Sequence, residues 1–210
     1  MGGAAQDRQP RRRKAARPQE ILDAALREFA TNGYAATRLE DVARRAGISK
    51  GTIYLYFANK DELFKAVVRH FVSPQLDALR ALADGFAGTT EELLRGPLRA
   101  FMTQFANADE RHIVRLLMAE GHKHPDLTAF YFREVVERGM GLLRHVIARG
   151  IERGELRKTA IDQFPQLIVA PFIVAIIWKT LFERHSPLDL ERLLDAHIDV
   201  LLNGLRMHRA

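Results

Sequence analysis

The sequence predicts an all-α protein in which a small N-terminal helix-turn-helix head is joined to a larger helical body. Apolar residues recur at helical spacing along most of the chain, and no alternation typical of β-strands competes with them. Residues 1–60 carry twelve Lys or Arg against six Asp or Glu, whereas residues 61–210 carry twenty of each. Because phosphate neutralisation supplies most non-specific affinity for DNA, a basic head on a neutral body indicates double-stranded DNA as a partner.

Composition limits the other classes of protein. The chain has 210 residues, 47% of them hydrophobic, and can bury a sizeable core. It has no cysteine, which excludes disulfides, thiol catalysis and Cys-type zinc sites. No apolar secretory segment follows Met1, and the uncharged run over residues 167–178 is shorter than the roughly 20 residues of a membrane span. We therefore expect a cytoplasmic protein without a membrane segment.

Charge and periodicity divide the chain into three parts. We expect a disordered basic tail over residues 1–17, a DNA-binding head over residues 18–62, and a helical body over residues 63–210. The tail has four basic residues in a row, residues 11–14, and little apolar content with which to fold. It either follows DNA phosphates or is an idle charged terminus.

The first two helices of the head are marked by their ends. Apolar side chains recur every three or four positions over residues 18–32, until Gly33 stops the pattern. Thr37, followed three residues later by Glu40, is a capping box, which satisfies free N–H groups at a helix start. A short second helix should therefore begin there and end at Gly47, where a residue with positive φ is favoured.

Residues 50–57 form the third element of the head. Their β-branched and aromatic composition taken alone indicates a strand. However, no second strand-like run lies nearby to pair with it, Ser49 can cap a helix, and Asn59 with Glu62 repeats the capping-box pattern. We therefore predict a short helix.

The body begins with a helix from about Lys60, which Pro74 bends or breaks because proline lacks a backbone donor. Residues 84–90 include two glycines and predict a loop that separates head from body. Beyond the loop, periodicity predicts an antiparallel array of helices over residues 91–107, 110–121, 126–153, 164–184 and 188–207.

Two short helices around a tight turn fit a helix-turn-helix. Residues 37–60, TRLEDVARRAGISKGTIYLYFANK, closely resemble the signature of the TetR family of bacterial repressors. The resemblance covers residues 18–70. Beyond them it is one of length and helical layout, although residues 118–156 look like the ligand domain of one broad subgroup.

The resemblance implies a repressor that a small-molecule effector releases from a near-palindromic operator, with residues 63–210 as the domain for ligand binding and dimerisation. Two heads would enter successive major grooves about 34 to 36 Å apart. The helix from Lys60 through the Pro74 bend would transmit the effector's signal, as a two-state element that each ligand biases.

Candidate DNA-binding residues lie in and around the second helix of the motif. Gly51 lacks a side chain, which lets the helix start approach the major groove, and Lys50 and Thr52 beside it suit base edges or phosphates. Tyrosine hydroxyls and a lysine at a helix N-terminus suit phosphates. One tyrosine could instead pack in the core of the head, and Thr37 is a helix cap in any event. The candidates are Thr37, Ser49, Lys50, Gly51, Thr52, Tyr54, Tyr56 and Lys60.

Bulky side chains on the body helices are candidates for an effector pocket, as the resemblance implies, although ordinary core packing is the alternative for each. Their character favours an apolar or aromatic effector. They are Phe101, Phe105, Met118, His122, Phe130, Tyr131, Phe172 and Trp178.

The last two helices carry strong apolar stripes, which leave more apolar surface than a monomer covers. We expect them to pair with the same helices of a second subunit, forming a homodimer through a four-helix interface. The candidates are Leu167, Val174, Trp178, Leu190, Leu194, His197, Ile198, Leu201 and Leu205.

No catalytic motif is present: we find no phosphate-binding glycine loop, nucleophile elbow or paired acid and base. His122 and His124, with Glu120 and Asp126, are too loosely spaced to favour a metal over a polar loop or an effector contact by His122. We expect no enzyme, cofactor or metal. Two alternatives stay open: an architectural DNA binder without sequence choice, and an enzyme acting on an apolar substrate in the body.

Overall fold

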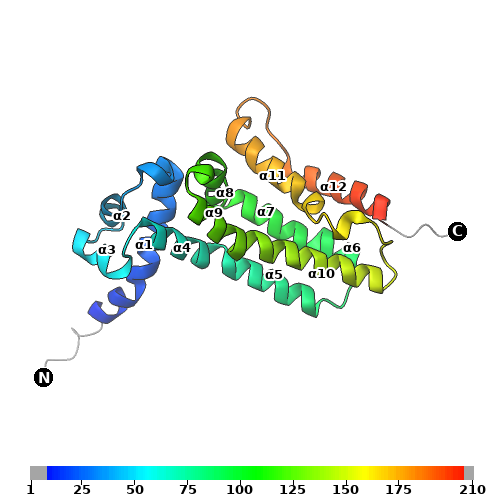
Figure 1. The fold of residues 1–210 in the computed structure, drawn as a ribbon, viewed down its shortest axis with the longest axis horizontal. Coiled ribbons are helices and arrows are strands. Elements are labelled where there is room, and N and C mark those ends of the chain that lie inside the picture. The colour runs from blue at the N-terminus through cyan, green and yellow to red at the C-terminus, as the bar shows by residue number, and fades with distance from the viewer. Residues whose placement is uncertain (1–8, 206–210) are drawn as a thin grey trace, which may run out of the picture.

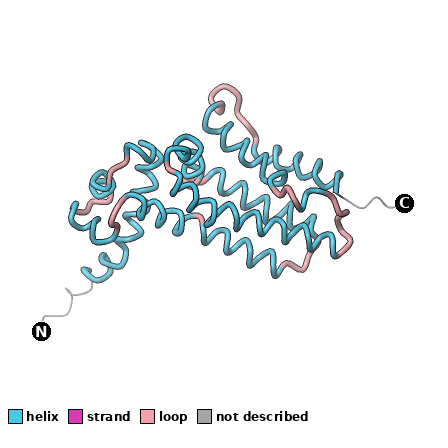
Figure 2. Tube along the Cα trace, in the orientation of Figure 1, coloured by secondary structure: helices cyan, strands magenta, loops and turns pink. Residues whose placement is uncertain are grey.

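The computed structural model describes residues 9–205 and places them in an elongated, all-helical molecule (Figure 1). The head, α1 to α3, lies at one end, and the body helices run side by side away from it. Figure 2 shows helices joined by loops, and no strand occurs among the described residues. The predicted all-α class is confirmed.

Helix α1 spans Gln9–Ala36 and therefore reaches into the tail that we expected to be disordered. The expected disorder disagrees with the structure over residues 9–17, because arginine, lysine and alanine are strong helix formers that can extend an existing helix. Residues 1–8 of the tail lie outside the described part of the chain. The helix is kinked at Gly33, where φ is 75° and ψ is 177°, in agreement with the predicted stop.

Helix α2 spans Leu39–Arg45, and its predicted capping box is wrong. Arg38 is the N-cap residue and makes no side-chain cap. The Thr37 side chain is buried instead, and its hydroxyl donates to the carbonyl oxygen of Gly33 at 2.6 Å. The kink at Gly33 explains the difference, because it leaves a carbonyl at the end of the straight part of α1 in need of a donor.

The remaining end signals of the head agree with the sequence. Gly47 has a φ of 67° in the turn before α3, which spans Lys50–Tyr56 as a helix rather than a strand. The Ser49 hydroxyl accepts the Thr52 N–H at 3.1 Å. The Asn59 side chain accepts the Glu62 N–H at 2.9 Å at the start of α4, Lys60–Phe71.

Helix α4 leads from the head into the body and is separated from α5 by Val72. Helix α5 spans Ser73–Gly85 with Pro74 in its first turn, which confirms the predicted break. Because α5 lies in the body beside α10, the loop after it lies at the far end of the molecule (Figure 1). The prediction that this loop separates head from body is therefore wrong.

The body helices follow the predicted order with two local changes. A π-helical stretch interrupts the helix around Pro97, whose missing N–H removes one helical hydrogen bond, and another follows Tyr131. The elements are α6 Thr90–Leu93, η1 Leu94–Leu98, α7 Arg99–Asn107, α8 Arg111–Glu120, η2 Gly121–Lys123, α9 Pro125–Tyr131, η3 Phe132–Glu137, α10 Arg138–Glu152, η4 Ala160–Asp162, α11 Gln166–Leu181 and α12 Leu190–Leu205.

Candidate nucleic-acid interface and ligand cavity

Helix α3 anchors one face in the head and exposes the other. Ile53 is fully buried, whereas Tyr54 and Tyr56 are 45% and 39% exposed, so neither tyrosine is core. Ser49, Lys50 and Gly51 are also exposed. A Cβ added at Gly51 would meet no atom closer than 3.9 Å, so the fold itself does not require glycine there. The open space above this turn suits close approach of a large partner.

Glu40, in the first turn of α2, holds two of the candidate side chains. The Lys50 Nζ lies 2.9 Å from its Oε1 atom, and the Tyr54 hydroxyl donates to the same oxygen at 3.1 Å. The hydrogen bond from Lys50 lowers the pKa of Glu40 to about 2. Lys50 is therefore already paired with a carboxylate. A phosphate or a base must displace that carboxylate in order to bind Lys50.

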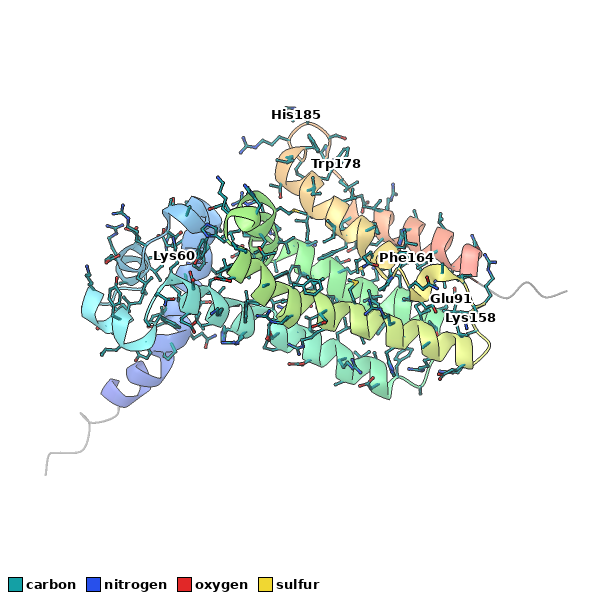
Figure 3. The ribbon with its side chains drawn as sticks, in the orientation of Figure 1. Lys60, Glu91, Lys158, Phe164, Trp178 and His185 are labelled. Carbon is teal, nitrogen blue, oxygen red and sulfur yellow. The ribbon has the colours of Figure 1, made fainter. Side chains whose placement is uncertain are left out.

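Lys60 is the first residue of α4, as predicted, but its ammonium group already has partners within the chain. Its Nζ atom donates to the carbonyl oxygens of Tyr34, at 2.6 Å, and Ala35, at 3.0 Å, and lies 4.5 Å from the centre of the Tyr34 ring. Burial lowers its pKa. Figure 3 places Lys60 where the head meets the body. Lys60 would have to leave these carbonyls to reach a phosphate.

The N–H groups of the same two residues bind an acid from the body. The Glu120 carboxylate, at the end of α8, accepts the N–H of Tyr34 at 2.9 Å and that of Ala35 at 2.8 Å. We call Tyr34, Ala35, Lys60 and Glu120 the α1 clamp. A Cβ at Gly33 would overlap the Glu120 carboxylate, so glycine is needed there for space as well as for its positive φ.

Further contacts tie the head to the body around the clamp. Arg115 of α8 donates to the carbonyl oxygen of Ala30 in α1. The His124 ring packs edge-on against Tyr34 with centroids 4.6 Å apart, and the Arg69 guanidinium lies 5.0 Å from the Phe130 ring centre. Neither Glu120 nor Tyr34 was predicted in this role, because no sequence pattern signals a carboxylate that binds backbone 85 residues away.

The body contains an apolar cavity of about 730 Å³, within the size range of small-molecule sites. It lies between the α4–α5 joint, α7, α8, η3, α10 and α11. Val72, the residue directly after α4, and Val114 of α8 both line it, so its wall adjoins the two helices that supply the charged groups of the clamp.

Half of the predicted pocket residues line this cavity: Phe101, Phe105, Tyr131 and Phe172. The other half lie elsewhere. Met118 is 48% exposed, and His122 borders a separate surface hollow. Phe130, on α9, is buried and its ring faces the Arg69 guanidinium. Trp178 donates to the carbonyl oxygen of Ser186 at 2.6 Å, near the α11–α12 loop, where Figure 3 shows it.

The predicted pocket residues are mostly bulky and aromatic, whereas unbranched and branched apolar side chains without rings form most of the wall. Helical periodicity identifies an inward face but cannot tell the lining of a cavity from a filled core. Among those missed are Val72, Leu76, Val114, Val135, Met140 and Ile173.

The predicted dimer surface needs correction. Leu190, Leu194, Ile198 and Leu205 are buried within their own chain, because α7 and η1 already cover this face of α12. His197 and Leu201 are half-buried, as is Trp178. Leu167 and Val174 are 54% and 48% exposed, as an interface would require. Other exposed apolar residues that the prediction missed are Phe164, Leu181, Phe182 and Val200.

The described residues include no helix long and apolar enough to cross a bilayer. Across the same part of the chain, no three His, Asp or Glu side chains are grouped to hold a metal.

Comparisons with known proteins follow this division into head and body. Residues 21–67 match the family model of bacterial regulatory proteins, tetR family, and residues 87–197 match a tetracyclin repressor-like C-terminal domain.

Individual relatives match along nearly the whole chain. A proposed mycofactocin biosynthesis transcriptional regulator, MftR of Mycobacterium tuberculosis, is 30% identical over 92% of this chain and 93% of its own. The transcriptional repressor KstR2 of Mycolicibacterium smegmatis is 26% identical over 91% of each chain. The structure of FadR from Bacillus subtilis in complex with stearoyl-CoA shares the fold, with a TM-score of 0.75 at 21% identity, over 89% of this chain and 98% of FadR.

Proposed function

Because this chain belongs to the TetR family of bacterial regulatory proteins, we propose that it is a homodimeric repressor released from its operator by a small molecule. In this proposal α3 reads the major groove of a near-palindromic operator, and the effector fills the body cavity. Lys50, Gly51 and Thr52 face the bases, and the tyrosines of α3 contact phosphates.

A single observation supports the coupling: the cavity wall adjoins both helices that carry the charged groups of the α1 clamp. Val72 and Val114 belong to the cavity wall, while Lys60 and Glu120 lie at the head-facing ends of α4 and α8. A ligand that shifts either helix changes the position of the α1–α2 turn, and with it the α2–α3 unit. Weakening operator binding a hundredfold requires about 2.7 kcal/mol of difference in ligand affinity between the two states.

The effector we propose is largely apolar, because the wall consists mainly of aliphatic and aromatic side chains. The FadR relative that was crystallised with stearoyl-CoA gives the first ligand to try. We assign the cavity a binding role rather than a catalytic one, since the sequence contains no motif for an acid, base or nucleophile.

The dimer we propose forms through the outward faces of α11 and α12, where Leu181 and Val200 are 61% and 72% exposed. Exposed apolar residues on adjacent helices of one face are typical of subunit interfaces.

The test starts with selection of bound duplexes from random DNA, because this step identifies an operator sequence by its binding to the protein. Fluorescence anisotropy at about 0.15 M salt then compares the selected duplex with its scrambled form for the wild type, Lys50→Ala and Lys158→Ala. Lys158 is the matched control, because it lies in the body, far from the head (Figure 3).

We expect the wild type and Lys158→Ala to prefer the selected duplex, and Lys50→Ala to lose at least tenfold in affinity for it. Addition of stearoyl-CoA, or of apolar compounds extracted from cells, should weaken the wild-type complex. Equal affinity for selected and scrambled duplexes would favour an architectural binder and contradict the proposal.

A further inference from the structure

The cavity contains almost no polar groups. Of its lining side chains within the described part of the chain, Glu137, Arg144 and Gln166 are exposed, so they mark its open edge. The rest of the wall is apolar except for Tyr131, at the end of α9. Its phenol is therefore the one group in the interior that can make a directed interaction with a ligand.

Tyr131 is partly accessible although it lies deep in the molecule. It packs against the buried cluster that joins head and body, and burial raises its pKa well above the ordinary value. A side chain that is deep yet accessible must face an internal space, and the cavity that it lines is that space.

The Tyr131 hydroxyl also has no partner. No backbone or side-chain group among the described residues makes a hydrogen bond with it, and burial alone accounts for its raised pKa. By contrast, Tyr34, whose pKa burial also raises, donates its hydroxyl to Asp61. The hydroxyl is not among the buried unpartnered atoms, so it is accessible, and a hydroxyl without a protein partner at a cavity wall is available to a partner that enters from outside the chain.

The charge state of the wall restricts what that partner is. The phenol stays protonated at neutral pH and donates one hydrogen bond. The cationic group of the wall, Arg144, lies at the exposed edge, so an anion held deep inside would have no counter-charge. A neutral oxygen acceptor satisfies the phenol without that cost.

We propose that Tyr131 is the specificity-determining residue of the cavity and selects ligands with a neutral carbonyl or hydroxyl oxygen within an apolar body. This assignment rests on the proposed ligand-binding role of the cavity. The oxygen would lie at the head-facing end of the cavity, next to the helices that carry the α1 clamp.

The test uses two neutral fluorescent probes that differ in one group. The first is 6-propionyl-2-(dimethylamino)naphthalene, whose emission moves to longer wavelength when its carbonyl accepts a hydrogen bond. The second is its 6-propyl analogue, in which CH₂ replaces the carbonyl. Both are titrated into the full-length wild type, Tyr131→Phe and Thr180→Val. Thr180 is the matched control, because its hydroxyl lies outside the cavity and bonds the Ile176 carbonyl.

We expect Tyr131→Phe to bind the ketone about fivefold to tenfold more weakly than the wild type, the factor for one neutral hydrogen bond. The ketone's emission should move to shorter wavelength, while affinity for the propyl analogue stays the same. Thr180→Val should match the wild type with both probes. Because phenylalanine keeps the ring, we expect the variant to fold, and an unchanged melting temperature checks this.

Other results would overturn the proposal. Unchanged ketone affinity and emission in Tyr131→Phe would show that the hydroxyl does not meet the ligand, and would leave the cavity's binding role intact. An equal loss for both probes would show that the residue acts through shape alone. If neither probe binds the wild type, or if Phe172→Trp, which fills the cavity, leaves binding unchanged, the binding role of the cavity fails as well.

Discussion

Removal of the Glu120 carboxylate should release the end of α1 from the body. The N–H groups of Tyr34 and Ala35 follow the kink at Gly33, and both are accepted by Glu120. Glu120→Ala leaves both N–H groups without this partner, while Glu120→Gln keeps one acceptor oxygen and loses the charge.

The size of the effect follows from the two hydrogen bonds. A hydrogen bond to a charged group contributes about 1.5 to 3 kcal/mol where water cannot replace it. The N–H of Ala35 is exposed and re-forms its bond with water, whereas that of Tyr34 is partly buried. We therefore expect Glu120→Ala to cost about 2 kcal/mol in local stability, and Glu120→Gln roughly half of that.

Amide hydrogen exchange measures this directly, because a local loss of about 2 kcal/mol speeds exchange roughly thirtyfold. The acceleration should appear at Tyr34 and Ala35, with Glu120→Gln intermediate. The matched control is Glu92→Ala, which removes a carboxylate that accepts a backbone N–H at the start of α6, remote from the head. If both amides stay as protected in Glu120→Ala as in the wild type, the clamp does not hold α1 and the proposed coupling fails.

Three further predictions concern the DNA surface, the cavity and the dimer. Glu40→Gln removes the carboxylate that pairs with Lys50, so affinity for scrambled duplex should rise. The slope of log affinity against log salt concentration should become steeper by up to about one, and Glu152→Gln is the control. Burial raises the pKa of Tyr131, so its contribution to stability is complete below the ordinary tyrosine pKa, near 10, and is lost as pH rises above that value. The denaturant midpoint of Tyr131→Phe should therefore fall less steeply above pH 10 than that of the wild type. Leu181→Asp places a charge on the proposed interface and should convert the dimer to the 23.8 kDa monomer in sedimentation, whereas Leu82→Asp, also on an exposed apolar position, should not.

The sequence predicted most of the fold because its helix ends carry local signals. The positive φ at Gly47, the Ser49 cap and the break at Pro74 each depend on residues a few positions apart, and all three are confirmed. The predicted Thr37 cap of α2 is wrong because the Thr37 hydroxyl donates to the Gly33 carbonyl oxygen, which the kink in α1 leaves without a helical partner.

The sites were harder to predict, since they depend on contacts between distant segments. An apolar stripe on a helix looks the same whether its own chain or a second subunit covers it, which is why Leu194 was assigned to the dimer surface although it is buried in its own protomer. The clamp role of Glu120 joins residues 85 or more positions apart and has no local signature. The α3 candidates, by contrast, belong to one continuous segment whose spacing fixes which side chains face outward.

Two heads held by one dimer should read adjacent major grooves only at one spacing, which is measured by changing the distance between the operator's half-sites. Affinity is measured for the selected operator and for versions with 5 or 10 base pairs inserted between its half-sites. Five base pairs turn the second half-site to the opposite face of the DNA, so affinity should fall to that of a single half-site, and 10 base pairs should not restore it because the dimer fixes the distance between the heads. Affinity that is independent of spacing would show that the heads bind separately and would contradict the account.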